Sequence, residues 1–441
     1  MNWEKLLSSQ RHGDKKPFDE RGRSAFEQDF DRIVFSYPFR RLQDKTQVHP
    51  LPEHDFVHTR LTHSLEVSSV GRSLGKRVGE VIIERNPSLK DKFISHDFGA
   101  IVAAASLAHD IGNPPFGHSG EDAISEFFKF GAGKKFQSQV NDLEWADLTT
   151  FEGNAQGFRI LNKSRYQGMK LTYASLAAFS KYPRQSIIDN PDKKRRSQKK
   201  YGFFQAEKEI FSAIAEETGL GLLGEYTWNR HPLAYLVEAA DDICYNLIDL
   251  EDGCRLGLVG YEETVNLFAT ILGDRFDREK LERIDTINER IGILRAMAVG
   301  KLIDECCELF LSEEKAILDG SFDTSLTDLI PSAEVLGNVI SLSIDKIYRS
   351  RNVMETEAAG FEVLPGLLEI FTNAVLEENA GSKKNKAIKR LLPPEIIIDL
   401  EENKNNTYLS LLTCVDFVSG LTDRHAISMF RKIKGISLPN T

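Results

Sequence analysis

The sequence predicts an all-α fold with at most a small β element. Apolar side chains recur at helical spacing along most of the chain, and strand signals are few. Proline and glycine lie at the ends of several apolar runs, where they terminate or start helices. A short strand is suggested only at residues 361–363.

Composition indicates an ordinary globular protein. Of 441 residues, 41% are hydrophobic and 28% are charged, and the net charge of −10 argues against a general nucleic-acid coat. The N-terminal segment shows no secretory signal pattern, and no continuous apolar run reaches membrane-spanning length. Five cysteines without a Cys-x-x-Cys pair fit reduced thiols. We therefore expect a cytoplasmic protein that does not bind membranes.

Taken in order, residues 1–23 are polar and predicted to be a loop, and 129–150 a partly irregular connection. Helical periodicity or boundary signals then predict helices over 24–36, 59–85, 152–162, 172–179, 233–252, 279–318, 332–348, 363–378 and 406–434. We expect residues 1–255 to form a catalytic core. Residues 256–441 should be a helical part that packs on this core and is not an independent domain.

An apolar helix that begins near Gly99 ends at an adjacent His109 and Asp110. Gly112 and Pro114 stop the helix just past the doublet. A buried, unpaired aspartate is costly, so Asp110 should have a partner, and a metal cation is one candidate. A lone His-Asp pair is more often a capped helix end, and only further residues favour a metal site.

A later helix carries Asp241, Tyr245 and Asp249 at i, i+4 and i+8, so the three side chains share one face. This acidic stripe lies beside an apolar flank. It predicts either the wall of a cavity or a solvated outer surface, and spacing alone does not separate the two.

The strongly basic run is Lys193 to Lys200. It is either a solvated loop, which we favour, or an anion site for nucleotide or single-stranded nucleic acid. The Gly219-x-Gly221-x-x-Gly224 pattern has no preceding strand, so we interpret it as a loop.

Several ordered blocks resemble the HD-domain deoxynucleoside triphosphate triphosphohydrolases, the bacterial dGTPase family. The blocks are FRRLQ-x-KTQV at 39–48, TRLTHSLEV at 59–67, HDIGNPPFGHSGE at 109–121, FEGNAQ at 151–156, LTYASL at 171–176 with KYP at 181–183, EAADDI-x-Y at 238–245 and GLTDR-x-A at 420–426. They span most of the chain. The resemblance implies an HD-type helical core with additional helices.

The resemblance also implies a reaction, in which a dNTP is cleaved at the α-phosphorus to deoxynucleoside and tripolyphosphate. It implies that one divalent ion is held by His63, His109, Asp110 and Asp241. This mixed nitrogen and oxygen set suits Mn²⁺ or Mg²⁺ first, with Co²⁺, Ni²⁺, Fe²⁺ and Zn²⁺ as alternatives. Asp241 is preferred over Asp242 because family members place this ligand four residues before the tyrosine.

His118 and Glu121 are expected to be an acid–base pair, in which the carboxylate raises the imidazole pKa. By resemblance, Tyr245 would pack against the deoxyribose and exclude a 2′-hydroxyl by contact. By resemblance, the substrate would be bound by Gln47, Arg60, Asn113, Asn154, Lys181, Tyr245 and Asp249.

Two other functions compete with this assignment. One is an HD-type nucleotide phosphatase or phosphodiesterase, which would share the metal ligands but would not release tripolyphosphate. The other is a nucleotide- or single-stranded nucleic-acid-sensing protein with weak catalysis, motivated by the basic run. The resemblance further implies a homo-oligomer, a hexamer among the options, and we also consider a single-stranded DNA or nucleotide effector. Base recognition is expected near residues 346–351.

Overall fold

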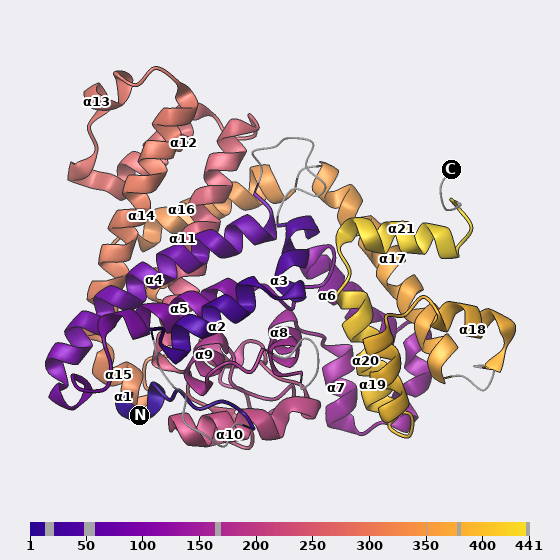
Figure 1. The fold of residues 1–441 in the computed structure, drawn as a ribbon. Helices are drawn as coiled ribbons and strands as arrows, with labels where there is room; N and C mark the ends of the chain where they lie inside the picture. The colour runs from indigo at the N-terminus through magenta and orange to yellow at the C-terminus, as the bar shows by residue number, and fades with distance from the viewer. Residues whose placement is uncertain (14–21, 48–57, 164–168, 350, 377–380, 438–441) are drawn as a thin grey trace.

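The computed structural model describes residues 1–13, 22–47, 58–163, 169–349, 351–376 and 381–437. Helices make up nearly all of the regular structure (Figure 1), so the all-α prediction is confirmed. The one sheet within these ranges is an antiparallel pair of β1 (Leu222–Gly224) and β2 (Thr227–Trp228). The strand suggested at 361–363 is wrong, because that stretch lies inside a long helix.

The helices up to residue 180 are α1 (Trp3–Leu6), α2 (Ala25–Val34), α3 (Tyr37–Arg41), α4 (Arg60–Arg85), α5 (Ser95–Ala108), α6 (Gly117–Lys129), α7 (Asp142–Thr149), α8 (Gly153–Asn162) and α9 (Tyr173–Phe179). The later helices are α10 (Lys208–Thr218), α11 (Pro232–Arg255), α12 (Tyr261–Leu272), α13 (Arg278–Glu282), α14 (Ile287–Ser312), α15 (Glu314–Asp319), α16 (Ala333–Ser343), α17 (Arg351–Leu376), α18 (Lys383–Lys389), α19 (Pro394–Glu402), α20 (Thr407–Ser419) and α21 (Asp423–Ile433). A π-helical turn, η8 (Ile344–Tyr348), follows α16. The helices expected at 279–318 and 406–434 are thus divided into shorter helices.

Helices α4 and α5 pack closely against each other, and glycines on α4 allow the approach. A Cβ added at Gly75 would lie 2.6 Å from the Phe98 carbonyl oxygen, and one added at Gly71 would lie 2.5 Å from the Ser106 hydroxyl. The two helices are therefore antiparallel at nearly backbone contact. This packing brings the start of α4 beside the end of α5, where the His-Asp doublet lies.

Helix α11 packs against both α4 and α5 and completes the frame of the site. It begins at Pro232, whose fixed φ suits the first helical position. The preceding His231 is buried; its ring accepts a hydrogen bond from the Leu233 N–H at 3.1 Å. Burial lowers the pKa of His231 to about 4, so the ring is neutral and caps the helix without a buried charge. The middle of α11 then faces the ends of α4 and α5.

A second hydrophobic core joins α6 and α7 to the C-terminal helices α17 and α20. By length and composition alone, the stretch Val353–Leu376 of α17 could cross a membrane. In this fold, however, Leu364, Leu367, Leu368 and Phe371 of α17 are fully buried against neighbouring helices. Packing in a protein core therefore accounts for the apolar character of this part of α17.

The two cores interleave along the sequence. The first core takes buried residues from Trp3 to Ile347, and the second takes residues from Phe116 to Ala426. Segments on both sides of residue 255 contribute to each core. The division into 1–255 and 256–441 stays a proposal, and the shared cores favour a C-terminal part that does not fold alone.

Candidate metal centre and nucleotide cavity

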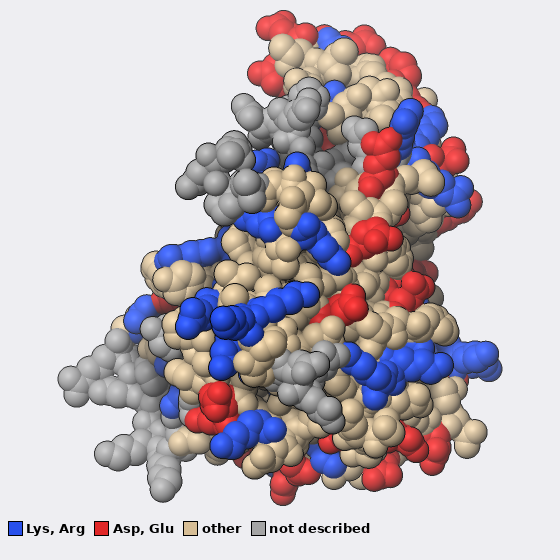
Figure 2. All heavy atoms as spheres, turned by 90° about the vertical axis from the view of Figure 1, so that its right-hand side faces the viewer, with Lys and Arg blue, Asp and Glu red and all other residues tan. Residues whose placement is uncertain are grey.

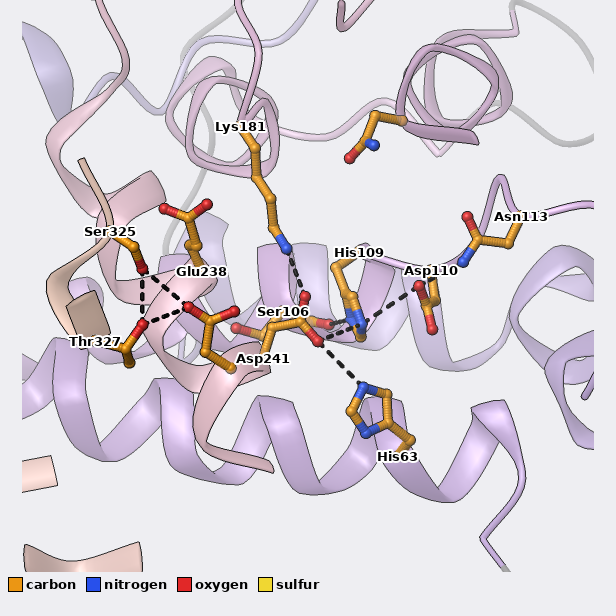
Figure 3. Close-up of polar contacts among 12 residues, drawn as sticks. His63, Ser106, His109, Asp110, Asn113, Lys181, Glu238, Asp241, Ser325 and Thr327 are labelled. Carbon is orange, nitrogen blue, oxygen red and sulfur yellow. Dashed lines mark hydrogen bonds and ion pairs between the residues drawn. The ribbon is translucent and has the colours of Figure 1, made fainter. Parts of the chain in front are cut away.

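Two histidines and one aspartate converge where α4 and α5 meet. His63 lies in the first turns of α4, and His109 and Asp110 follow the last residue of α5. One ligand atom from each of the three lies within 4.8 Å of the others, and all three residues are buried (Figure 3). His109 Nδ1 lies 2.7 Å from the Ser106 carbonyl oxygen. If Nδ1 carries the proton and donates it there, Nε2 is free to bind a metal.

Asp241 reaches the same point from α11. Its Oδ1 lies 3.2 Å from His63 Nε2 and 3.4 Å from His109 Nε2, while Lys181 Nζ donates to Oδ2 at 2.6 Å (Figure 3). Burial lowers the pKa of Lys181, but Asp241 and Glu238 together more than offset this, so the net shift is upward. Asp242 points elsewhere: its carboxylate accepts from the Ser325 and Thr327 hydroxyls at 2.9 and 2.6 Å.

Arg60 and Asn113 hold the Asp110 carboxylate. Arg60 Nη1 donates to Oδ2 at 2.6 Å, and Asn113 Nδ2 donates to Oδ1 at 2.6 Å. Burial raises the pKa of Asp110, but Arg60 and the two histidines hold it below its usual range. Asp110 is therefore an oriented carboxylate.

The chemistry of these donors fits a divalent cation. Burial lowers the pKa of His109, but the carboxylates of Asp110 and Asp241 raise it above its ordinary value. The carboxylates thus favour a positive charge at this point, and a proton on His109 meets part of that demand. Nitrogen and oxygen donors at such spacing suit Mn²⁺, Fe²⁺, Co²⁺, Ni²⁺ or Zn²⁺, and Mg²⁺ by its carboxylates.

A cavity of about 220 Å³ opens beside these residues. It combines polar groups from α4 and α6 with aromatic and acidic groups from α11 and the C-terminal helices. Its walls are Thr46, Gln47, Arg60, Phe116, Gly117, His118, Tyr245, Tyr348, Val353, Thr356 and Glu357. Four of the residues expected from sequence, Gln47, Arg60, His118 and Tyr245, line this one cavity.

Tyr348, at the end of the π-helical turn η8, is a site residue for which sequence gave only the range 346–351. Its hydroxyl donates to Asp249 Oδ2 at 2.6 Å, and its ring centroid lies 5.7 Å from that of Tyr245. Burial raises the pKa of Asp249 to about 7, and the Tyr348 hydrogen bond offsets part of this rise. Asp249 therefore already has a hydroxyl partner, placed where we expected a sugar hydroxyl.

The expected His118–Glu121 pair is not present, and this is a correction. Glu121 Oε1 accepts from the Gly153 N–H at 2.8 Å, and Lys200 Nζ lies 3.7 Å from Oε2. His118 is exposed to solvent, but its ring lies at the cavity wall. Partial desolvation there and the positive charges of Lys200 and Arg60 lower its pKa. The predicted rise in the His118 pKa was wrong because the amide at the start of α8 and Lys200, both from distant segments, satisfy Glu121.

Lys200 is a residue whose place sequence analysis missed. It donates to Glu152 Oε1 at 2.9 Å, and Asn154 Nδ2 donates to the same oxygen at 2.8 Å. Asn154 is thus beside the site but is engaged with Glu152. Burial raises the pKa of both Glu121 and Glu152, and Lys200 supplies the positive charge that partly offsets it.

The basic run is not simply a solvated loop. Arg195 pairs with Asp323 at 2.9 Å, and Arg196 pairs with Glu238 of α11 at 2.8 Å. With Lys200 also paired, only Lys193, Lys194 and Lys199 of this run's cations are exposed. The anion site proposed for this run therefore loses its strongest cations to carboxylates of the same chain.

Comparison with known sequences identifies an HD domain in this chain. The family model of the HD domain matches residues 60–144, which hold His63, His109 and Asp110. A deoxyguanosinetriphosphate triphosphohydrolase-like protein of Synechocystis sp. is 44% identical over 99% of this chain and 100% of its own length. One from Pseudomonas aeruginosa is 40% identical over the full length of both chains.

More distant relatives carry the name without the suffix. The deoxyguanosinetriphosphate triphosphohydrolase of Yersinia enterocolitica is 31% identical over 93% of both chains. The chain belongs to the deoxyguanosinetriphosphate triphosphohydrolase family, as the ordered sequence blocks predicted. The relatives support a hydrolase with a nucleotide substrate.

Proposed function

We propose that this protein is a metal-dependent dNTP triphosphohydrolase that converts a dNTP, dGTP by preference, to deoxynucleoside and tripolyphosphate. The observation that carries the proposal is the cavity in which Arg60, His118 and Tyr245 surround one space beside the His63–His109–Asp110 cluster. A phosphate-binding cation, an acid–base group and an aromatic wall are the parts that this reaction needs. Bound at the cluster, a divalent ion, Mn²⁺ or Mg²⁺ in our proposal, would polarise a phosphoryl oxygen and acidify water.

The chain's own residues would bind and orient the triphosphate. Arg60 presents a guanidinium whose Nη2 lies toward Gly117 at the cavity wall. Lys181 and Lys200 are each paired with a carboxylate that a phosphate oxygen would replace. Water adds to the α-phosphorus and the bond to the 5′-oxygen breaks. The attacking water gives up a proton and the departing 5′-oxygen takes one; we assign this transfer to the His118 ring, while the Glu121 carboxylate holds the start of α8 in place.

Sugar and base selection follow from the far walls of the cavity. Tyr245 would occupy the space that a 2′-hydroxyl needs. Gln47 and Asp249 would accept hydrogen bonds from the 3′-hydroxyl. The Tyr348 hydroxyl now donates to Asp249, at the place proposed for the 3′-hydroxyl of the sugar. Asn113 and Asn154 would act on the phosphate side. Glu357 lines the cavity from α17, and a carboxylate accepts from the N–H groups on the guanine edge. That is our basis for placing dGTP first.

The experiment that tests the function is turnover of each dNTP and of GTP with Mn²⁺ or Mg²⁺, with products separated by anion exchange. Intact tripolyphosphate and deoxynucleoside in equal amounts are expected. Inorganic phosphate or a nucleoside monophosphate as the first product would instead identify a phosphatase or phosphodiesterase. Tight dNTP binding without turnover under all metals would identify a sensing protein.

We also propose that a nucleic-acid effector binds the protein. Its proposed binding site is not the basic run but another surface. Lys and Arg gather on the face that carries α18 and α21, although the chain is acidic overall (Figure 2). Exposed members are Lys383, Lys384, Lys386, Arg390, Arg431, Lys432 and Lys434. Single-stranded DNA should bind here with strong salt dependence, and charge reversal of Lys432 and Lys434 should weaken it, whereas reversal of Lys193 and Lys194 should not. We also propose a cytoplasmic homo-oligomer, to be tested by its mass in solution.

A further inference from the structure

The GLTDR-x-A block near the C-terminus has no role in the proposed chemistry, yet its aspartate reaches the active site. We propose that Asp423 is a positioning residue that ties together the segment before Gln47 and the loop before His118. Asp423 is the first residue of α21 and is only 1% exposed. The inference rests on the proposed function for its kinetic consequence, but its contacts are independent of it.

One oxygen of Asp423 holds the segment that carries Gln47. Oδ2 accepts from the Thr46 N–H at 3.0 Å and also from the Thr46 hydroxyl. Thr46 and Gln47 both line the cavity that Arg60, His118 and Tyr245 also line. A carboxylate that receives two donors from one residue fixes both the backbone and the side chain of that residue.

The other oxygen holds the loop that leads into α6. Oδ1 accepts from the Phe116 N–H at 3.2 Å. Phe116 has φ 66°, in the left-handed region that a side chain with a Cβ disfavours, and Gly117 follows with φ 61°. Such a conformation persists only where its surroundings impose it. Here the Asp423 carboxylate and the packing of Phe116 on Gly360 of α17 impose it, and the direction of His118 depends on it.

Asp423 is not needed to cap its own helix. Thr422 is the N-cap of α21, and its hydroxyl accepts from the His425 N–H at 3.3 Å. The Asp423 side chain therefore spans 377 residues of sequence to reach Thr46 instead of satisfying its own first turn. This separates the assigned role from ordinary helix capping.

A second bridge joins the same segments. Lys45, which is 4% exposed, donates from Nζ to the Asn113 carbonyl oxygen at 2.6 Å and to the Ser419 carbonyl oxygen at 2.9 Å. The residue before Thr46 thus contacts the loop before Phe116 and the end of α20. Two adjacent residues, 45 and 46, are therefore held between the metal-site loop and the C-terminal block.

The first test is amide hydrogen exchange, which needs no activity. In Asp423→Asn, one side-chain oxygen becomes an NH₂ group that faces the donors of Thr46 or Phe116. Exchange at these two amides should become at least about 10-fold faster. The matched control is Arg424→Ala, the exposed neighbour on α21, which should exchange as the wild type does. Unchanged exchange at both amides in Asp423→Asn would overturn the inference.

The second test is kinetic. A misplacement of about 1 Å in a catalytic group can cost about 10²-fold in rate, so kcat/KM of Asp423→Asn should fall by about that factor while Mn²⁺ affinity stays unchanged. Thr46→Val loses only the hydroxyl bond and should raise KM with little change in kcat, and Thr46→Ser should restore KM. Wild-type kinetics in both Asp423→Asn and Thr46→Val would overturn the positioning role. If the wild type cleaves no dNTP, the proposed function fails, and hydrogen exchange still decides the inference.

Discussion

Neutralising Asp110 should remove the stabilisation that a divalent ion gives the folded chain. An ion that binds only the folded state at 100 times its Kd stabilises it by about 2.7 kcal/mol. Unfolding entropy is about 2.1 cal/mol/K per residue, so a chain of 441 residues has about 0.9 kcal/mol/K. Mn²⁺ at that concentration should therefore raise the Tm of the wild type by about 3 °C.

The substitution should be Asp110→Asn and not Asp110→Ala. Arg60 is buried, and Asp110 is its only ion-pair partner in the described parts of the chain. Removing that partner altogether would cost about 3–5 kcal/mol, as for other broken buried pairs. Such a loss would obscure the metal effect. Asparagine removes the charge but keeps the shape and one acceptor oxygen for the Arg60 guanidinium, so the loss should be smaller than with alanine and the metal-free variant should remain folded.

The assay is thermal unfolding of metal-free protein with and without Mn²⁺. A 100-fold loss of affinity leaves the ion near its Kd, where it contributes only about 0.4 kcal/mol, so the Tm of Asp110→Asn should rise by less than about 0.5 °C. The control is Asp242→Asn, which alters the adjacent carboxylate on α11 that faces Ser325 and Thr327. Its Tm should rise by about 3 °C, as in the wild type. Equal rises in all three proteins would refute the assignment of Asp110 as a ligand.

Three further predictions concern the cavity. His118→Ala should lower the single-turnover rate by about 10²–10⁴ and leave Mn²⁺ affinity unchanged, and loss of the ion would make His118 a ligand instead. Tyr245→Ala should narrow the ratio of kcat/KM for dGTP over GTP by up to about 10²-fold, and an unchanged ratio would place the sugar gate elsewhere. Because burial raises the pKa of Asp249 from 3.8 to about 7, folding takes up a proton and the free energy of unfolding should fall as pH rises from about 4 to 7. In Asp249→Asn, the free energy of unfolding should fall less over the same range, as measured by denaturant titrations at pH 5 and pH 8.

The sequence predicts local features of this fold better than contacts between distant segments. Gly112 and Pro114 correctly marked the end of α5 beside His109, because helix termination is encoded within a few residues. The pairing of Glu121 could not be predicted this way. Its helical neighbour His118 was the nearest candidate in sequence, but the fold places the Gly153 amide, at the start of α8, against the carboxylate.

The same distinction explains why the contacts of Lys200 and Tyr348 were not predicted. Lys200 and Tyr348 contact Glu152 and Asp249 across 48 and 99 residues of sequence. Such contacts depend on how helices pack, and a pattern of residue types along one helix does not specify that packing. The basic run shows the consequence. Its lysines and arginines have the composition of a solvated loop, yet carboxylates on other elements pair with three of them.

The HD-domain match at 60–144 holds three of the proposed metal ligands but not a complete site. Asp241 comes from α11, and Lys181 pairs with it from the end of α9. Asp423 fixes Thr46 and Phe116 from the far end of the chain. The proposed chemistry would therefore depend on packing over nearly the whole length, which agrees with relatives that align over 99% of this chain or more. Removal of α21 and the block before it should accordingly abolish dNTP turnover although every proposed metal ligand remains.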